Sequence, residues 1–176
     1  MKKLLLLVAV LIAGISANAQ EGIEKGTILV EANTGNAMVG TTSFSFASSD
    51  GSTEYSFGLD GGYFVMDNLA IKVGLGYQGL DPDLEESTSA FSYRIGAKYY
   101  IANQFPVTLD LTGASGDAVE NFNGDTPLWL GIGGGYAWFV TENISIEPGL
   151  RYNYSLNEDF TDEGIFQFNI GFALFF

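Results

Sequence analysis

Residues 165–176 read I-F-Q-F-N-I-G-F-A-L-F-F, and this stretch decides the fold class. Every second residue from Phe166 to Phe176 is large and apolar, whereas the residues between them are mostly small or polar. A period of two predicts a β-strand whose two faces meet different surroundings. In a soluble β-protein the apolar face would cover a protein core, but in a membrane barrel it would meet lipid. The other strands must distinguish these two arrangements.

The N-terminal segment has the pattern of a secretory signal peptide. A positively charged start is followed by an apolar run over residues 4–15, and then by Ala17 and Ala19 at the small-x-small spacing of a cleavage site. The apolar run is shorter than the roughly 20 residues that a membrane-spanning helix needs. We therefore expect residues 1–19 to be a cleaved signal peptide and residues 20–176 to be one domain. An uncleaved N-terminal anchor is the alternative.

The composition favours an acidic all-β chain that does not bind nucleic acid. Seven Lys and Arg stand against 21 Asp and Glu, and the net charge of −14 argues against a polyanionic partner. Hydrophobic residues make up 47% and aromatic residues 14% of the chain, which is too much for an acidic disordered protein. Because the sequence contains no cysteine, it offers neither a disulfide framework nor thiol chemistry.

Alternation with a period of two recurs along the whole chain and predicts eight strands. They cover residues 26–34, 54–66, 69–78, 89–101, 105–113, 127–140, 144–155 and 165–176. They are joined alternately by short turns at 67–68, 102–104 and 141–143 and by long polar loops at 35–53, 80–88, 114–126 and 156–163. This is the hairpin pattern of an up-and-down outer-membrane barrel. The predicted fold class is all-β, an eight-stranded antiparallel up-and-down transmembrane β-barrel.

The charged residues in the middle of the strands all share the small and polar face. They are Glu31, Asp60, Lys72, Arg94, Lys98, Asp110, Glu147 and Arg151. A solvent-facing surface would confine charges to one face as well, so this parity does not decide between membrane and soluble barrels. Three other features favour the membrane: the apolar faces are uninterrupted, the opposite faces are rich in glycine, and the acids concentrate in the long loops.

Two roles are open for this interior charge cluster. The first is an ion path or gate, and the second is a salt-bridged plug that satisfies charges which would be costly to bury alone. An eight-stranded barrel has an interior just wide enough for side chains to fill, so we favour the plug. The inward-facing glycines argue for some water-filled space beside it.

Two stretches resemble a known family. Residues 62–71, which read G-Y-F-V-M-D-N-L-A-I, resemble the second hairpin of the small outer-membrane β-barrel family, the group similar to OmpX and the OmpA membrane domain. Phe172, Leu174 and Phe176 resemble the C-terminal signal that is read by the outer-membrane assembly machinery. The resemblance implies that residues 20–176 form a monomeric barrel in the cell outer membrane of a Gram-negative bacterium. Its partners would be the assembly machinery, outer-membrane lipid and lipopolysaccharide. The resemblance implies no particular activity.

The sequence argues against an enzyme and against a cofactor. Histidine and cysteine are both absent, which removes Ser-His catalysis, Cys catalysis and the usual transition-metal sites. The acidic loops could bind Ca²⁺ or bridge through divalent cations to anionic lipopolysaccharide. Their spacing does not match an EF-hand, and a solvated surface is the alternative. These acids are Asp81, Asp83, Glu85, Glu86, Glu158, Asp159, Asp162 and Glu163. The loop at 35–53, with Phe44 and Phe46, could be an adhesive strand edge or a flexible loop.

Three functions remain open at this stage. The leading hypothesis is a small integral outer-membrane barrel with an envelope-structural or surface-interaction role. The second is a narrow channel for small or hydrophobic solutes. The third is a secreted soluble β-barrel that binds an apolar ligand.

Overall fold

The computed structural model describes residues 23–35, 39, 44–49, 52–82, 86–119 and 125–176. The strands in chain order are β1 (Ile28–Asn33), β2 (Ser45–Ser49), β3 (Ser52–Met66), β4 (Leu69–Pro82), β5 (Thr88–Ile101), β6 (Phe105–Ser115), β7 (Leu128–Gly135), β8 (Trp138–Thr141), β9 (Ile144–Ser155) and β10 (Ile165–Phe175). In the part of the chain that is described, no helix is long and apolar enough to cross a membrane.

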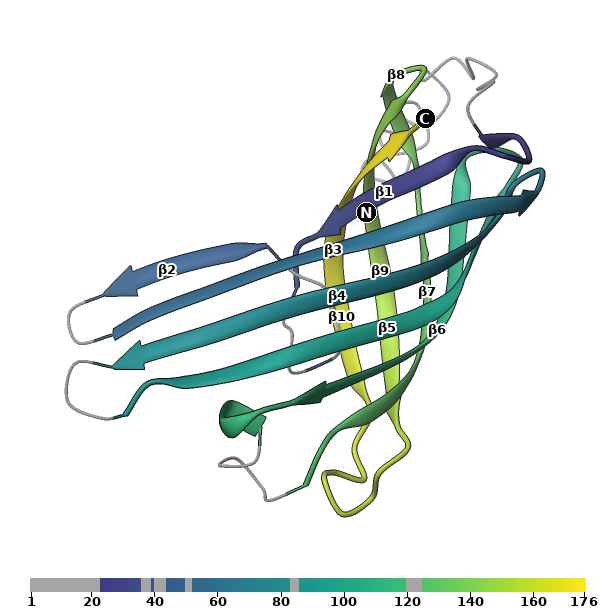
Figure 1. Ribbon diagram of the computed structural model, residues 1–176. Helices are drawn as coiled ribbons and strands as arrows, with labels where there is room; N and C mark the ends of the chain where they lie inside the picture. Colours follow the sequence, from purple (N-terminus) through teal and green to yellow (C-terminus); the bar gives the residue numbers. More distant parts are fainter. Residues whose placement is uncertain (1–22, 36–38, 40–43, 50–51, 83–85, 120–124) are drawn as a thin grey trace, which may run out of the picture.

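The strands form one closed antiparallel barrel (Figure 1). Each strand from β3 to β6 pairs with the next, β7 and β8 both pair with β9, and β9 pairs with β10. The ring closes because β1 pairs with β10 on one side and with β3 on the other. β7 and β8 together occupy one strand position beside β9, and β1 and β2 together occupy one beside β3. The ten strands therefore fill eight positions, and the predicted eight-stranded up-and-down barrel is confirmed.

The predicted loop at 35–53 is wrong in part, because it contains β2. β1 pairs with the half of β3 that is nearer the short turn, where Glu31 faces Asp60. β2 pairs with the other half, where Ser45 faces Ser56. The backbone N–H of Phe44 donates to the carbonyl of Asn33 at 3.0 Å, which brings β2 back beside the end of β1. β2 therefore takes over the pairing with β3 where β1 ends.

The predicted strand at 127–140 is interrupted after Gly135. The N–H of Tyr136 donates to the carbonyl of Pro148 at 3.0 Å, but a proline has no N–H to return the second bond of the pair. The N–H of Ala137 instead donates to the carbonyl of Gln104 at 2.7 Å. A missing donor on β9 thus accounts for the break between β7 and β8.

The strands β2, β3, β4 and β5 reach beyond the rest of the wall at the end of the barrel that carries the long loops (Figure 1). β4 runs to Pro82, although the sequence pattern predicted an end at Gln78. Its added residues pair with β3, as Asp81 does with Thr53. These segments are polar, so they lack the hydrophobic alternation by which strands are recognised. β2, β3, β4 and β5 together make this projecting sheet.

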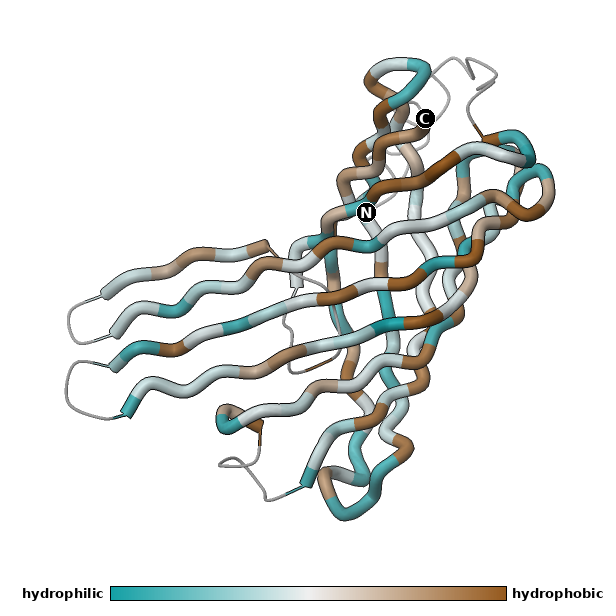
Figure 2. Tube along the Cα trace, in the orientation of Figure 1, coloured by the Kyte–Doolittle hydropathy of each residue, from teal (hydrophilic) through white to brown (hydrophobic). Residues whose placement is uncertain are grey.

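The outer surface of the barrel is apolar, and its interior is polar. Leu59, Ile95 and Phe168 point outward and are 55%, 56% and 65% exposed, whereas Asp60 and Asn153 are completely buried. Figure 2 shows hydrophobic and hydrophilic residues alternating along the strands. A soluble protein buries its large apolar residues, so this inverted arrangement is that of a barrel whose outer face meets lipid.

Candidate functional site

The eight predicted interior charges all lie inside the barrel and are buried. Each stands on the inward-facing parity of its strand, and none is more than 7% exposed. β1, β3, β4 and β6 contribute one charge each, and β5 and β9 contribute two each. Four cations and four anions therefore share an interior in which an unpaired ion would be costly.

Lys98 is the centre of the half of the network near the short turns. Its Nζ lies 2.5 Å from a carboxylate oxygen of Glu31 and 2.5 Å from one of Glu147. Glu147 also accepts hydrogen bonds from the hydroxyl of Tyr100 at 2.8 Å and from that of Ser145 at 2.7 Å. Lys98 thus bridges β1 and β9 across the bore.

Lys72 joins this group to the rest of the network. Its Nζ lies 2.9 Å from Oε1 of Glu31 and 3.0 Å from Oδ2 of Asp60. These two acids are direct cross-strand neighbours, a placement in which like charges repel. The lysine between them offsets that repulsion, and Asn33 donates a further hydrogen bond to Glu31 at 2.8 Å.

Two arginines complete the network at the half nearer the long loops. Nη1 of Arg94 lies 2.8 Å from Oδ2 of Asp60, and its Nε lies 3.8 Å from Oδ1 of Asp110. Arg151 binds Asp110 through two parallel hydrogen bonds of 2.6 and 2.5 Å, the geometry in which guanidinium and carboxylate interact most strongly. Its Nε donates to Asn153 at 2.6 Å.

The contacts form one continuous chain in which the sign of the charge alternates. In order, its members are Glu147, Lys98, Glu31, Lys72, Asp60, Arg94, Asp110 and Arg151. The chain begins and ends on β9, and each residue within it contacts two partners of opposite sign. The attraction between these partners offsets the cost of removing eight charges from water.

The network does not fill the whole bore. β7 and β10 contribute no charge, and Gly131, Gly133 and Gly135 of β7 stand where side chains would otherwise enter the interior. A cavity of about 50 Å³ lies there, and the polar residues Thr108 and Asn169 are part of its lining. Gly133 and Gly135 line this cavity and leave room for a few water molecules, whereas the guanidinium of Arg151 fills the space beside Gly131.

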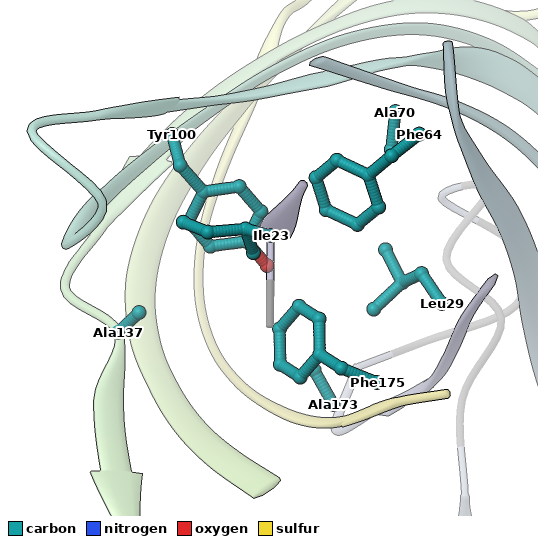
Figure 3. Packing of buried hydrophobic residues seen from close by; sticks show 8 residues of the cluster. All are labelled: Ile23, Leu29, Phe64, Ala70, Tyr100, Ala137, Ala173 and Phe175. Carbon is teal, nitrogen blue, oxygen red and sulfur yellow. The ribbon is translucent and has the colours of Figure 1, made fainter. Parts of the chain in front are cut away.

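An apolar cluster closes the bore at the short-turn end (Figure 3). It consists of Ile23, Leu29, Phe64, Ala70, Tyr100, Ala137, Ala173 and Phe175. The rings of Phe64, Tyr100 and Phe175 pack against one another with centroids 6.1 to 6.2 Å apart. Figure 3 shows Ile23 among these rings, at the middle of the opening.

The segment that carries Ile23 is fastened across this opening by backbone hydrogen bonds. The N–H of Asn68 donates to the carbonyl of Ile23 at 2.9 Å, and that of Gly26 donates to the carbonyl of Phe64 at 2.9 Å. The N–H of Lys25 donates to the carboxylate of Asp67 at 3.0 Å. Residues 23–26 are therefore held across the short-turn end of the bore and cover it.

A second apolar cluster lies inside the long-loop end. It consists of Ala90, Ala114, Val119, Trp129 and Phe160, and the rings of Trp129 and Phe160 meet edge to face at 6.0 Å. Sequence reasoning missed both clusters. The signal that could have revealed them is a set of aromatic residues on the otherwise polar parity near the strand ends, such as Phe64, Tyr100 and Phe139.

The remaining predicted residues lie apart from this interior. Phe172, Leu174 and Phe176 point outward and are 47%, 37% and 70% exposed. Ala17 and Ala19 are outside the described residues, as are Asp83 and Glu85 of the acidic loops. Within the described ranges, no group of three or more acidic side chains is placed to hold a metal ion.

Solved structures with similar folds are outer-membrane barrels. Ail of Yersinia pestis matches with a TM-score of 0.51 at 13% identity, over 87% of this chain and 99% of that one. The N-terminal barrel domain of Pseudomonas aeruginosa OprF matches at 0.46 and 15%, over 86% and 98%. Neisserial surface protein A matches at 0.41 and 20%, over 85% and 95%. No protein-family model matches the sequence, and neither does any curated protein.

The fold and its sealed, charge-paired interior define a class of protein. The apolar outside, the closed antiparallel ring and the likeness to Ail are those of a small eight-stranded outer-membrane β-barrel. Because the identity to Ail is low, that likeness concerns the fold alone.

Proposed function

We propose that this protein is a small integral barrel of a Gram-negative outer membrane, where it contributes to envelope structure and presents a surface for interaction. The observation that carries this proposal is the apolar belt around a neutral, internally paired core. Such a molecule is stabilised by lipid on its outside and requires nothing bound within.

The proposal is tested by the location and solubility of the native protein. Cell fractionation should recover it with the outer membrane and release it only with detergent. On gels, an unboiled sample should migrate differently from a boiled one, because a closed barrel keeps its compact form in detergent. A freely dissolved monomer in the periplasm or culture medium, obtained without detergent, would overturn the proposal.

The surface-interaction part of the proposal rests on β2. All five of its residues are exposed, and among the described strands only β3 pairs with it. A strand with one unpaired edge can accept another strand through main-chain hydrogen bonds. The edge is neutral, since it reads S-F-A-S-S, so backbone pairing rather than charge would supply the affinity.

The two other candidate functions are less well supported. A narrow channel requires a continuous path, but apolar clusters and the ion-pair network occupy both ends and the middle of the bore. A soluble carrier of apolar ligands requires an apolar pocket, whereas the cavity here is lined by charged and polar side chains. A soluble carrier also leaves the exposed apolar belt unexplained. We also propose that the barrel is monomeric and has no catalytic role.

A further inference from the structure

The cavity beside the ion-pair network has a lining with more positive than negative charges. Lys72, Lys98, Arg94 and Arg151 line it, together with only two acids, Glu31 and Glu147. The other two acids of the network, Asp60 and Asp110, pair with these cations away from the cavity. The network as a whole is neutral, but the side that faces the empty space is cationic.

The hydrogen-bond donors of three of these cations are not all used. A lysine has three donors and an arginine has five. Lys72 and Lys98 each contact two carboxylates, and Arg151 donates three hydrogen bonds. One donor on each lysine and two on the arginine therefore have no acceptor among the described residues, although the ammonium of Lys98 also lies 5.1 Å from the centre of the Tyr100 ring.

The two acids in the lining have little capacity left. Glu31 accepts hydrogen bonds from Asn33, Lys72 and Lys98. Glu147 accepts three as well, from Lys98, Tyr100 and Ser145. A carboxylate has about four acceptor positions, so each of these acids has about one unused. The cavity thus offers a surplus of donors and of positive charge.

We propose that this cavity binds a small monovalent inorganic anion of halide size. An anion accepts the unused donors and balances the cationic wall, whereas a cation would meet four like charges. An apolar occupant would leave the donors unsatisfied at a cost. The volume of about 50 Å³ is enough for a halide together with a few water molecules.

Bromide is the probe, because it can be located by its anomalous scattering. The full mature chain is refolded and crystallised in detergent with bromide as the anion. An anomalous peak is expected in the cavity, within hydrogen-bonding range of Lys72, Lys98 or Arg151. Density without anomalous signal at saturating bromide would show that the cavity holds water only, and it would overturn the proposal.

Asn169→Asp provides a matched variant. It has nearly the same shape as asparagine, and it places a fixed negative charge in the lining of the cavity on β10. The bromide peak should then disappear, because the new carboxylate balances the positive charge of the cavity lining and repels the anion. Gly61→Ala is the control, since a Cβ at Gly61 points outward with nothing within 4 Å, and it should keep the peak. Undiminished bromide in Asn169→Asp would contradict the proposed site, and the wild-type result decides the matter if that variant does not fold.

Discussion

Lys98 is the cation that holds together the half of the charge network near the short turns. Its ammonium group contacts Glu31 and Glu147, both buried. Lys98→Met keeps the length of the side chain but leaves the two carboxylates without their shared cation. Removing one partner of a buried ion pair costs about 3–5 kcal/mol, so a loss in that range is expected. Denaturant unfolding in detergent micelles or lipid vesicles measures it.

Lys25→Met is the control for this prediction. Lys25 is exposed at the short-turn end, and among the described residues only its backbone N–H has a hydrogen-bond partner. Its replacement should leave the free energy of unfolding within about 0.5 kcal/mol of wild type. Equal effects of the two substitutions would show that the interior ion pairs contribute little to stability.

Replacing Thr112, unlike replacing Lys98, should not lower the stability of the protein. It is completely buried, and its hydroxyl has no hydrogen-bond partner among the described residues. Thr112→Val keeps the shape and removes a polar group whose burial is uncompensated, so stability should stay equal or rise by up to about 1 kcal/mol. The same unfolding measurement applies. A marked loss of stability would indicate that an ordered water satisfies the hydroxyl.

At the scale of strands, β5 and β6 are joined by a close fit between Tyr93 and Gly113. The two residues are direct cross-strand partners on the outer face, and a Cβ at Gly113 would collide with the tyrosine ring. Gly113→Val therefore has to displace the ring of Tyr93. Because this ring lies on the outer face and can turn away, the cost should be about 1 kcal/mol, the low end for overpacking. Refolding yield into micelles, followed by the mobility of unboiled samples, should fall accordingly.

Gly61→Ala separates this effect from the general consequences of replacing a strand glycine. It also lies on the outer face, but its new methyl group would contact nothing. Refolding yield should match wild type. If both variants fold equally poorly, loss of backbone freedom rather than the Tyr93 contact is responsible.

The projecting sheet gives a prediction about topology. Because the chain has no cysteine, one can be introduced at any position without interference. Ser48→Cys in β2 should react with a membrane-impermeant maleimide on intact cells, since β2 lies at the long-loop end, which faces outward in such barrels. Glu142→Cys, in the short turn before β9, should react only after the outer membrane is permeabilised. The reverse labelling pattern would show that the barrel has the opposite orientation in the membrane.

At the scale of the whole molecule, the closed bore predicts that the protein does not conduct ions across a membrane. Apolar clusters seal both ends, and the ion pairs occupy the middle. Reconstitution into planar lipid bilayers should therefore give no conductance, or very small and brief openings. Large and stable openings would contradict the plug interpretation of the interior charges and favour the channel.

The alternation along each strand was enough to predict the ring of strands and the face on which each charge lies. It placed Glu31 and Lys98 on the same inner face, although they are far apart in the sequence. It did not reveal which acid each cation contacts, because that depends on the stagger between strands. Lys98 meets Glu31 and Glu147 only because β1, β5 and β9 present them at the same height in the bore.

The sequence by itself determined the strand order, the short turns and the inverted distribution of apolar and charged residues. All three follow from the alternation of residues along each strand and from the short polar segments between strands. The tertiary structure decided how the bore is closed. Phe64, Tyr100 and Phe175 come from three separate strands, and they meet around Ile23 only when the ring has closed. The same holds for the projecting sheet and for the cavity beside β7, since polar extensions and glycines carry no pattern of their own and acquire a role only from their neighbours.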